Sequence, residues 1–407
     1  MRVLFTTMPG EGHLNPLVPL AHALTAAGHE VAVACAPSFC PMVEARGLRA
    51  FPMGLDWSIA EKWVERWTEL RDIPKEHYIT WIWTNIFAGD VAEQALPDLL
   101  AIARAWSPDV IVRETCEFGG WLAAETLGLP HASVEVTLFS FYQRDAAPVA
   151  ASLARILDRA GQPADDVQAR LFAHLHLSFV PPSFQDPAVP LPTTAHALRL
   201  LLLDPLPGEL APPWLTALSA RPIVYATGGT IGDRTTFFAA IIAGVRDLNV
   251  TLVATLGRTL DPAQFGPQPA NVHLTGYISQ ALLLPRCAVV VTHGGFSSVL
   301  GALACGVPLV ILADGADRPV NARRAAALGA AIALGPDERT PEAIRAAVQT
   351  VLDDPRYRQR AQEVQAEIAA LPGPECGVEL LEQLVAKPQM PLHTPRQGIG
   401  YTLDGQR

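Results

Sequence analysis

In the run of residues 292 to 324, the end of an apolar strand is followed by two glycines and then directly by a predicted helix. The strand AVVVTH ends at His293, Gly295 follows closely, and Ser297 and Ser298 open the predicted helix. Backbone N–H groups at a helix N-terminus lack intrahelical partners and carry partial positive charge, so they attract an anion. Glycine lets that anion approach the backbone closely, and the serine hydroxyls add hydrogen-bond donors. The segment therefore predicts a diphosphate site.

A second polar cluster follows the next apolar strand, PLVIL. It consists of Asp314, Asp317, Arg318 and Asn321, whose side chains can donate to or accept from hydroxyl groups. Side chains that read sugar hydroxyls beside a diphosphate cradle indicate a nucleotide-sugar site.

Apolar strands alternate with amphipathic helices along the whole chain. Strands are predicted at RVLFTT, EVAVAC, DVIV and HASVEV in the first half, and at IVYAT, TLVATL, NVHLTG, AVVVTH, PLVIL and AAIAL in the second. This alternation favours parallel sheets that are covered by helices on both faces. The proline-rich stretch 181–222 breaks regular structure and predicts an interdomain linker region. We therefore expect an α/β protein with two doubly wound, Rossmann-like domains that face a cleft.

Composition excludes several classes of protein. A net charge of −10 without a basic cluster argues against nucleic acid as a partner. No segment has the roughly 20 uninterrupted apolar residues of a transmembrane helix, and the N-terminus lacks the features of a signal peptide. The six cysteines are scattered and no pair has zinc-site spacing, which is typical of a reduced, cytoplasmic protein.

These motifs resemble the signature of glycosyltransferase family 1, in particular its bacterial branch that acts on natural products such as antibiotics. The C-terminal signature is matched at His293, Gly294, Gly295, Ser297, Ser298, Ala302, Leu303, Gly306, Val307, Pro308, Asp317, Arg318, Asn321 and Ala322. After the first strand, the chain also has the family's Gly-His-x-Asn-Pro arrangement, beginning at Gly12. One position departs from the pattern, because Arg318 stands where the family usually has Gln.

The resemblance implies the GT-B fold and a division of the chain. We expect an N-terminal acceptor-binding domain over 1–203, a linker over 204–221 and a nucleotide-sugar-binding domain over 222–372. A C-terminal helix, 373–387, would cross back to the N-terminal domain, and 388–407 would form a tail.

The resemblance also implies that His13 takes a proton from the acceptor hydroxyl, which then displaces the nucleoside diphosphate with inversion. A carboxylate that holds the imidazole tautomer would assist such a base. Glu114, after the strand DVIV, is the candidate, and Glu117 is the alternative. Arg113 offers a competing interpretation, since it could neutralise Glu114 in a plain ion pair.

Further donor contacts follow from the family pattern. Tyr277 would stack on the pyrimidine, the backbone at Ile278 would bind the base edge, and Gln280 would hold the ribose. Thr230 in the turn TGGT and Arg258 would contact the phosphates, while Gly12 would line the donor site. Many nucleotide-sugar enzymes of the other large fold bind Mn²⁺ through Asp-x-Asp, which this chain lacks, so no metal and no cofactor are expected.

The acceptor is expected to be apolar and planar, such as a polyketide, flavonoid or macrolide aglycone. Aromatic residues are dense in the segment that the family uses for acceptor loops, and the candidates are Trp57, Trp83, Phe87 and Phe141. Expected partners are thus a UDP- or dTDP-sugar and this small molecule, with a homodimer left open.

Two other functions stay open at this point. One is a non-catalytic glycosyltransferase-like accessory or binding protein, against which the retained His13 and the complete cradle argue. The other is a different GT-B enzyme, such as a nucleotide-sugar epimerase or a lipid-linked N-acetylglucosaminyl transferase, against which the Gly-His-x-Asn-Pro start argues.

The departure at Arg318 has two interpretations. If Arg318 faces the sugar, it supplies donors but no acceptor, so a glucose hydroxyl would be left unpaired and a dTDP-deoxysugar would be preferred to UDP-glucose. If Arg318 turns to solvent or to Asp314, Asp317 alone reads the sugar.

Overall fold

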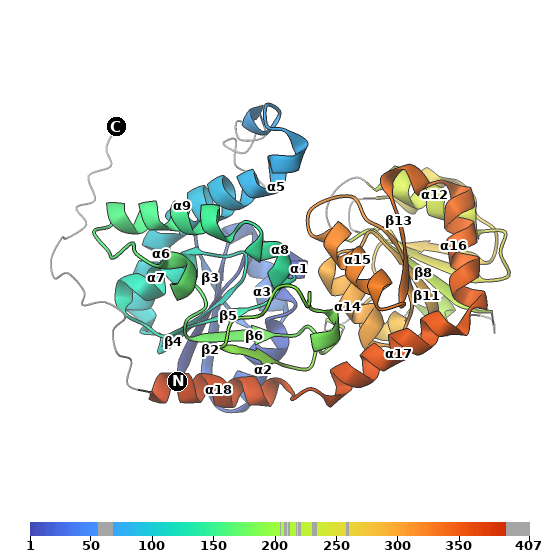
Figure 1. Ribbon diagram of the computed structural model, residues 1–407. Coiled ribbons are helices and arrows are strands. Elements are labelled where there is room, and N and C mark those ends of the chain that lie inside the picture. The colour runs from blue at the N-terminus through green and yellow to red at the C-terminus, as the bar shows by residue number, and fades with distance from the viewer. Residues whose placement is uncertain are drawn as a thin grey trace.

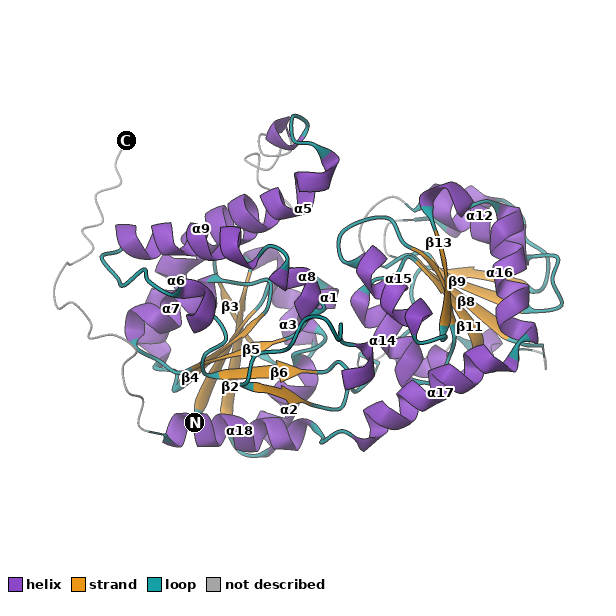
Figure 2. Cartoon of the chain, in the orientation of Figure 1, coloured by secondary structure: helices purple, strands orange, loops and turns teal. Residues whose placement is uncertain are grey.

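The computed structural model describes residues 1–55, 68–203, 205–206, 210, 212–216, 218, 221–229, 234–257 and 260–387. Two lobes lie side by side, and each contains a parallel sheet with helices on both faces (Figures 1 and 2). Among the described residues, no helix is long and apolar enough to span a membrane.

The first sheet has seven strands within the described residues, in the order β3-β2-β1-β4-β5-β6-β7. Its strands are β1 (Arg2–Thr6), β2 (Glu30–Cys35), β3 (Arg49–Pro52), β4 (Val110–Glu114), β5 (His131–Val134), β6 (Leu175–Ser178) and β7 (Ala195–Ala197). Its helices are α1 (Glu11–Leu14), α2 (Val18–Ala26), α3 (Cys40–Ala45), α5 (Tyr78–Trp81), α6 (Ala92–Trp106), α7 (Gly119–Leu127), α8 (Phe139–Gln143), α9 (Ala146–Arg159) and α10 (Val167–Arg170). A π-helical segment, η3 (Ile82–Val91), joins α5 to α6, and short 3₁₀ turns are η1 (Pro37–Phe39), η2 (Lys75–His77) and η4 (Pro182–Phe184).

The second sheet has the order β10-β9-β8-β11-β12-β13. Its strands are β8 (Ile223–Thr227), β9 (Thr251–Thr255), β10 (Val272–Thr275), β11 (Cys287–Thr292), β12 (Leu309–Leu312) and β13 (Ala331–Leu334). The helices are α11 (Pro213–Thr216), α12 (Thr235–Val245), α13 (Gln280–Leu283), α14 (Phe296–Ala304), α15 (Arg318–Ala327), α16 (Pro341–Asp353), α17 (Pro355–Ala370) and α18 (Pro374–Ala386), with 3₁₀ turns η5 (Pro262–Phe265), η6 (Leu284–Arg286) and η7 (Pro336–Glu338).

All pairings in both sheets are parallel. Every residue of β4, β8 and β9 is buried, as expected for strands covered on both faces, and most of these residues are apolar, with the charged pair Arg113 and Glu114 at the end of β4 as the exception. The prediction of two doubly wound α/β domains is therefore confirmed.

One expectation about the proline-rich stretch 181–222 is wrong. Within it, Ala195–Ala197 form β7, which pairs with β6 through Ala195 opposite His176. The prolines lie outside these residues, and an edge strand needs a partner on one side alone. The strand has three residues, Ala-His-Ala, and alanine has a low β propensity, so the sequence pattern is too short and too weak to predict it.

The last helix returns to the first domain. After α17, the chain reaches α18, which lies against α2 and β6 at the base of the N-terminal lobe (Figure 1). Leu381, which is fully buried, packs there in one apolar cluster with Leu20 of α2 and Leu177 of β6. Nε2 of His29 adds a 3.0 Å contact to Glu382.

Replacing Leu381 by Ala should lower the free energy of unfolding by about 2–5 kcal/mol, because the truncated side chain leaves a cavity between α18 and the first domain. The matched control is Glu379→Ala, on the exposed side of the same helix, which should change stability by less than about 0.5 kcal/mol. Urea unfolding of the two variants measures the difference, and equal stabilities would show that α18 contributes little to this packing.

Candidate active site

A pocket of about 510 Å³ lies between the two domains. Residues that follow β1 and β4 line one side, and residues that follow β8 and β11 line the other. In each sheet these are the neighbouring strands at which the strand order reverses. Ligands of open α/β sheets bind beyond the carboxyl ends of the strands at such switch points, so the fold provides one site from two sheets.

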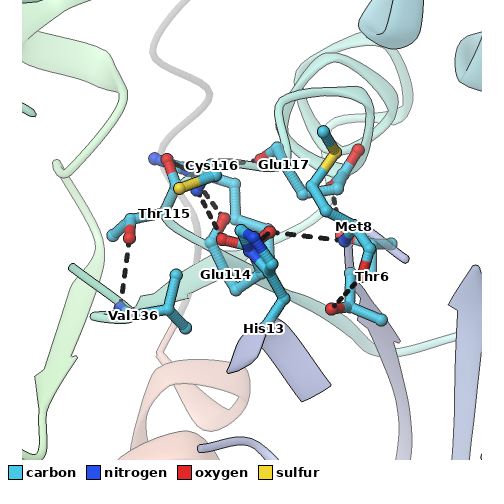
Figure 3. Close-up of polar contacts among 10 residues, drawn as sticks. Thr6, Met8, His13, Glu114, Thr115, Cys116, Glu117 and Val136 are labelled. Atoms are coloured by element: carbon cyan, nitrogen blue, oxygen red, sulfur yellow. Dashed lines mark hydrogen bonds and ion pairs between the residues drawn. The ribbon is translucent and has the colours of Figure 1, made fainter. Parts of the chain in front are cut away.

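His13 and Glu114 meet at the first switch point. His13 lies on α1, after β1, and its Nδ1 is 3.0 Å from Oε1 of Glu114, the last residue of β4 (Figure 3). The Glu114 side chain is fully buried, whereas 31% of the His13 side chain is exposed. The N–H of Met8 donates to Oε1 at 3.3 Å and the N–H of Cys116 donates to Oε2. The backbone therefore orients the carboxylate, and the carboxylate orients the imidazole.

Opposing effects act on the pKa of His13. Burial lowers the pKa, but the charge of Glu114, the hydrogen bond to it and the charge of Asp317 outweigh burial and raise the pKa above its ordinary value. The site therefore stabilises the protonated imidazole, which is the form that a general base takes after it has accepted a proton.

The alternatives for Glu114 have different contacts. Glu117 accepts from Oγ1 of Thr6 and, at 2.9 Å, from the N–H of Gly120, so it caps α7. The Arg113 guanidinium donates to backbone carbonyls, including those of Glu114 at 3.2 Å and Leu171 at 3.3 Å. The carboxylate that contacts His13 is that of Glu114.

A glycine turn joins β11 to α14 at the second switch point. Gly294 has φ +91°, in the left-handed region that favours glycine, and its carbonyl accepts from Nδ2 of Asn321 at 3.0 Å. A Cβ at Gly295 would lie 2.6 Å from Nε2 of His293, so glycine alone leaves room for this ring. Asn321 therefore holds the turn, and Gly295 lets His293 pack against it.

The start of α14 faces the pocket. Ser297 and Ser298 lie in its first turn and line the pocket together with His293. Burial lowers the pKa of His293 to about 3, and the charges of Arg318 and Arg234 contribute. The His293 ring is therefore neutral near pH 7 and offers one N–H donor. Helix N-terminus, hydroxyls and imidazole together form an anion site.

Arg234 is a pocket residue that sequence reasoning missed. It precedes α12 and forms an ion pair with Asp314, and Arg318 forms an ion pair with the same carboxylate. Two guanidinium groups on one carboxylate leave a net positive charge beside the cradle. Arg318 thus pairs with Asp314 and also lines the pocket, so it stays beside the proposed donor site. A single arginine after a glycine turn forms no recognisable motif. The signal that the sequence offered for a pocket residue was its position shortly after the turn TGGT.

The predicted base-binding residues line the pocket as well. Tyr277, Ile278 and Gln280 do so at the start of α13. Tyr225 and Thr255, which the sequence did not indicate, line the same region and are joined by a 2.9 Å hydrogen bond between Oη and Oγ1. Gly12 lines the pocket beside His13, while the predicted residues Thr230 and Arg258 lie outside the described residues.

Asp317 lies where the two domains meet. Its Oδ2 accepts from Nδ2 of Asn321 at 3.0 Å and from Oγ1 of Thr137, a residue of the first domain, at 3.4 Å. Burial raises the pKa of Asp317, although these hydrogen bonds and the charge of His13 act in the opposite direction. Asp317 and His13 are therefore close enough to act on one bound molecule.

The acceptor candidates form one aromatic wall. Trp83 and Phe87 lie on η3 with ring centroids 5.6 Å apart, and Phe141 of α8 lies 6.1 Å from Trp83, in edge-to-face contacts. All three line the pocket, although Trp83 is only 2% exposed and so also belongs to the core. Leucines 200–203 extend this apolar lining and were not predicted. Trp57 lies outside the described residues.

Two doubly wound domains that share one pocket are the architecture of the GT-B glycosyltransferases. The family model "Erythromycin biosynthesis protein CIII-like" matches residues 22–185 with its N-terminal domain and 239–386 with its C-terminal domain. The chain belongs to this family of bacterial natural-product glycosyltransferases.

Similar proteins cover almost the whole chain. The 4'-demethylrebeccamycin synthase of Lentzea aerocolonigenes is 31% identical over 94% of this chain and 99% of its own length. The 10-deoxymethynolide desosaminyltransferase of Streptomyces venezuelae is 31% identical over 96% of this chain and 99% of its own length. Among solved structures, glycosyltransferase VinC in complex with dTDP has a TM-score of 0.78 at 28% identity, covering 95% and 99%. Spinosyn forosaminyltransferase SpnP has a TM-score of 0.77 at 27% identity, and the match covers 95% of this chain and 100% of SpnP.

Replacing Glu114 by Gln should lower the pKa of His13, because the amide can still accept from Nδ1 but no longer attracts the imidazolium. Glu117→Gln is the matched control and should leave that pKa unchanged, since Glu117 contacts Thr6 and Gly120. NMR titration of labelled histidines measures both variants. A larger effect of Glu117→Gln would move the role of partner to Glu117.

Proposed function

We propose that this enzyme is an inverting, metal-independent glycosyltransferase that moves a sugar from a dTDP- or UDP-activated donor to a hydroxyl of an apolar natural product. The observation that carries the proposal is the His13–Glu114 pair, which lies in one pocket with the diphosphate cradle of α14.

The histidine acts as general base. With Nδ1 held by Glu114, the other ring nitrogen of His13 is free to accept a proton from the acceptor hydroxyl. The hydroxyl oxygen attacks the anomeric carbon as the bond to the diphosphate breaks on the opposite face, so the configuration inverts. Glu114 stabilises the imidazolium that results.

Groups of the second domain stabilise the leaving diphosphate. The start of α14 offers N–H groups and hydroxyls, neutral His293 offers one N–H, and Arg234 and Arg318 supply positive charge. Charge developing on the leaving oxygen is thus met by fixed donors and cations, the role that a metal ion has in other transferases. The nucleotide-sugar is a co-substrate, and no cofactor is required by this scheme.

The donor is proposed to be a dTDP-deoxysugar. VinC, which shares this fold, was solved with dTDP, and the similar proteins include desosaminyl- and forosaminyltransferases. Arg318 lines the pocket while it pairs with Asp314, and its guanidinium has donors alone, so it cannot supply the acceptor that Gln gives elsewhere in the family. A glucose hydroxyl that needs this acceptor would be left unpaired, at about 1–3 kcal/mol. Asp317 then reads the remaining sugar hydroxyls.

The acceptor is proposed to lie against the wall of Trp83, Phe87 and Phe141. An apolar aglycone buries its rings on these side chains and presents one hydroxyl toward His13.

Replacing His13 by Ala should reduce transfer by about 10²–10⁴-fold and leave nucleoside diphosphate binding intact, because the general base is lost while the cradle remains. Glu114→Ala should cost less, since His13 persists without its partner. The control is His196→Ala, an exposed residue of β7, which should keep full activity. Single-turnover rates and calorimetric binding measure the two effects. Unchanged turnover of His13→Ala would remove the mechanism.

The cradle makes a separate prediction. His293→Ala and the double replacement of Ser297 and Ser298 by Ala should weaken binding of free dTDP as well as of the intact donor, since both ligands carry the diphosphate. The control is His273→Ala, whose ring stacks on Trp214 in the same domain, and which should bind both ligands normally. Calorimetry compares them, and a loss confined to the sugar-bearing ligand would show that the diphosphate lies elsewhere.

Donor choice is tested by kcat/KM for a dTDP-deoxysugar and for UDP-glucose. The wild-type enzyme should prefer the former, and Arg318→Gln should shift the ratio toward UDP-glucose because Gln restores an acceptor. Arg323→Gln, at an exposed position of α15, should leave the ratio unchanged. The idea fails if UDP-glucose is the better donor for wild type and Arg318→Gln does not move the ratio.

A further inference from the structure

Cys116 places a thiol beside the histidine–carboxylate pair. The residue follows β4, and its N–H donates to Oε2 of Glu114 (Figure 3). Its Sγ, a ring nitrogen of His13 and a carboxylate oxygen of Glu114 all lie within 4.8 Å of one another. The mechanism above makes no use of this thiol.

The three ligand atoms have nearly the separations of a zinc site. Zinc bonds of about 2.0–2.3 Å at tetrahedral angles place ligand atoms about 3.3–3.8 Å apart. Nδ1 of His13 and Oε1 of Glu114 are 3.0 Å apart, and Sγ of Cys116 lies within 4.8 Å of one ring nitrogen of His13 and of one carboxylate oxygen of Glu114. The N–H of Cys116 holds Oε2, whereas Oε1 contacts the N–H of Met8 and Nδ1 of His13, so a cation bound here would replace the contact between His13 and Oε1.

The surrounding charges favour a cation. Glu114 is a carboxylate, and the charge of Asp317 acts on both His13 and Cys116. Burial raises the pKa of the Cys116 thiol well above its ordinary value, and the charges of Glu114 and Asp317 add to this effect.

A cation can reach this position from the pocket. His13, Cys116 and Asp317 line the pocket, and Glu114 lies buried behind them. The pocket leaves a fourth coordination position to water or to a substrate hydroxyl. Thiolate and imidazole ligands select Zn²⁺ and similar soft ions, whereas Mg²⁺ prefers oxygen ligands alone.

We propose that His13, Glu114 and Cys116 form an inhibitory site for a soft divalent cation such as Zn²⁺. As the metal bonds form, the thiol proton leaves to solvent and the imidazole proton moves from Nδ1 to Nε2, where it occupies the lone pair that would accept the proton of the acceptor hydroxyl. The metal then occupies the place of the Nδ1 proton, so Glu114 no longer stabilises an imidazolium and His13 no longer acts as a base. The inhibition rests on the proposed role of His13, whereas the binding of the metal does not.

Cobalt titration of the full chain tests the site directly, because a bound thiolate gives Co²⁺ an intense charge-transfer absorption. Wild type should develop this band, Zn²⁺ should displace it, and Cys116→Ser should lose it and bind Zn²⁺ more than about tenfold more weakly. Cys376→Ser, on α18, is the matched control and should keep the band. His13→Gln, as a second variant, should change the visible cobalt spectrum. Absence of the band in wild type, or its persistence in Cys116→Ser, overturns the site.

Transfer rates test the inhibition. Zn²⁺ should inhibit wild type and Cys376→Ser reversibly, with chelator restoring activity, while Mg²⁺ at the same concentration should not. Each rate is compared with the same variant's own metal-free rate, and Cys116→Ser should need more than about tenfold more Zn²⁺. Equal sensitivity of Cys116→Ser overturns the inhibitory role. Metal-free His13→Ala tests the base separately: if that variant is fully active, the proposed mechanism fails, while the cobalt band still decides the metal site.

Discussion

A buried carboxylate organises the catalytic side of this enzyme. Glu114 has no exposed surface on its side chain, and a charge in that position is stable only if hydrogen-bond donors surround it. The N–H groups of Met8 and Cys116 and the imidazole of His13 supply those donors. The loop after β1, the start of α1 and the turn after β4 are thereby joined at one point. His13 is oriented because it is one of the hydrogen-bond donors that the buried carboxylate of Glu114 requires.

The opposite wall of the pocket has the complementary charge. There the start of α14, the neutral ring of His293, and the guanidinium groups of Arg234 and Arg318 converge. In the proposed mechanism, one domain holds the group that receives a proton, and the other holds the groups that stabilise negative charge. Asp317 connects the two walls, because it is bonded to Asn321 within its own domain and to Thr137 of the other. In the proposed mechanism, a sugar bound at Asp317 would lie between base and leaving group, as displacement requires.

Much of the site could be predicted because its residues follow strands. His13, Glu114 and His293 stand at the carboxyl ends of β1, β4 and β11, where parallel sheets gather their ligands. Other residues of the site have no such signal in the sequence. Arg234 and Thr137 are single polar residues in loops, and Cys116 lies more than a hundred positions from His13 in sequence. The strand β7 was missed since it has only three residues, two of them alanine, which has a low β propensity. The ion pair between Arg318 and Asp314 could not be chosen from the sequence, because it forms where Arg234 also reaches Asp314 in the folded chain.

The sequence by itself determined the two parallel α/β domains, the glycine turn before α14 and the family, because periodicity and local motifs act over a few residues at a time. Tertiary structure decided which groups meet. It selected Glu114 over Glu117 as the neighbour of His13, since Glu117 is taken by Thr6 and Gly120. It turned Arg318 to Asp314 and brought Cys116 to the histidine. The reason is physical: these contacts join residues of different strands and domains, and their distances follow from how the sheets pack and not from spacing along the chain.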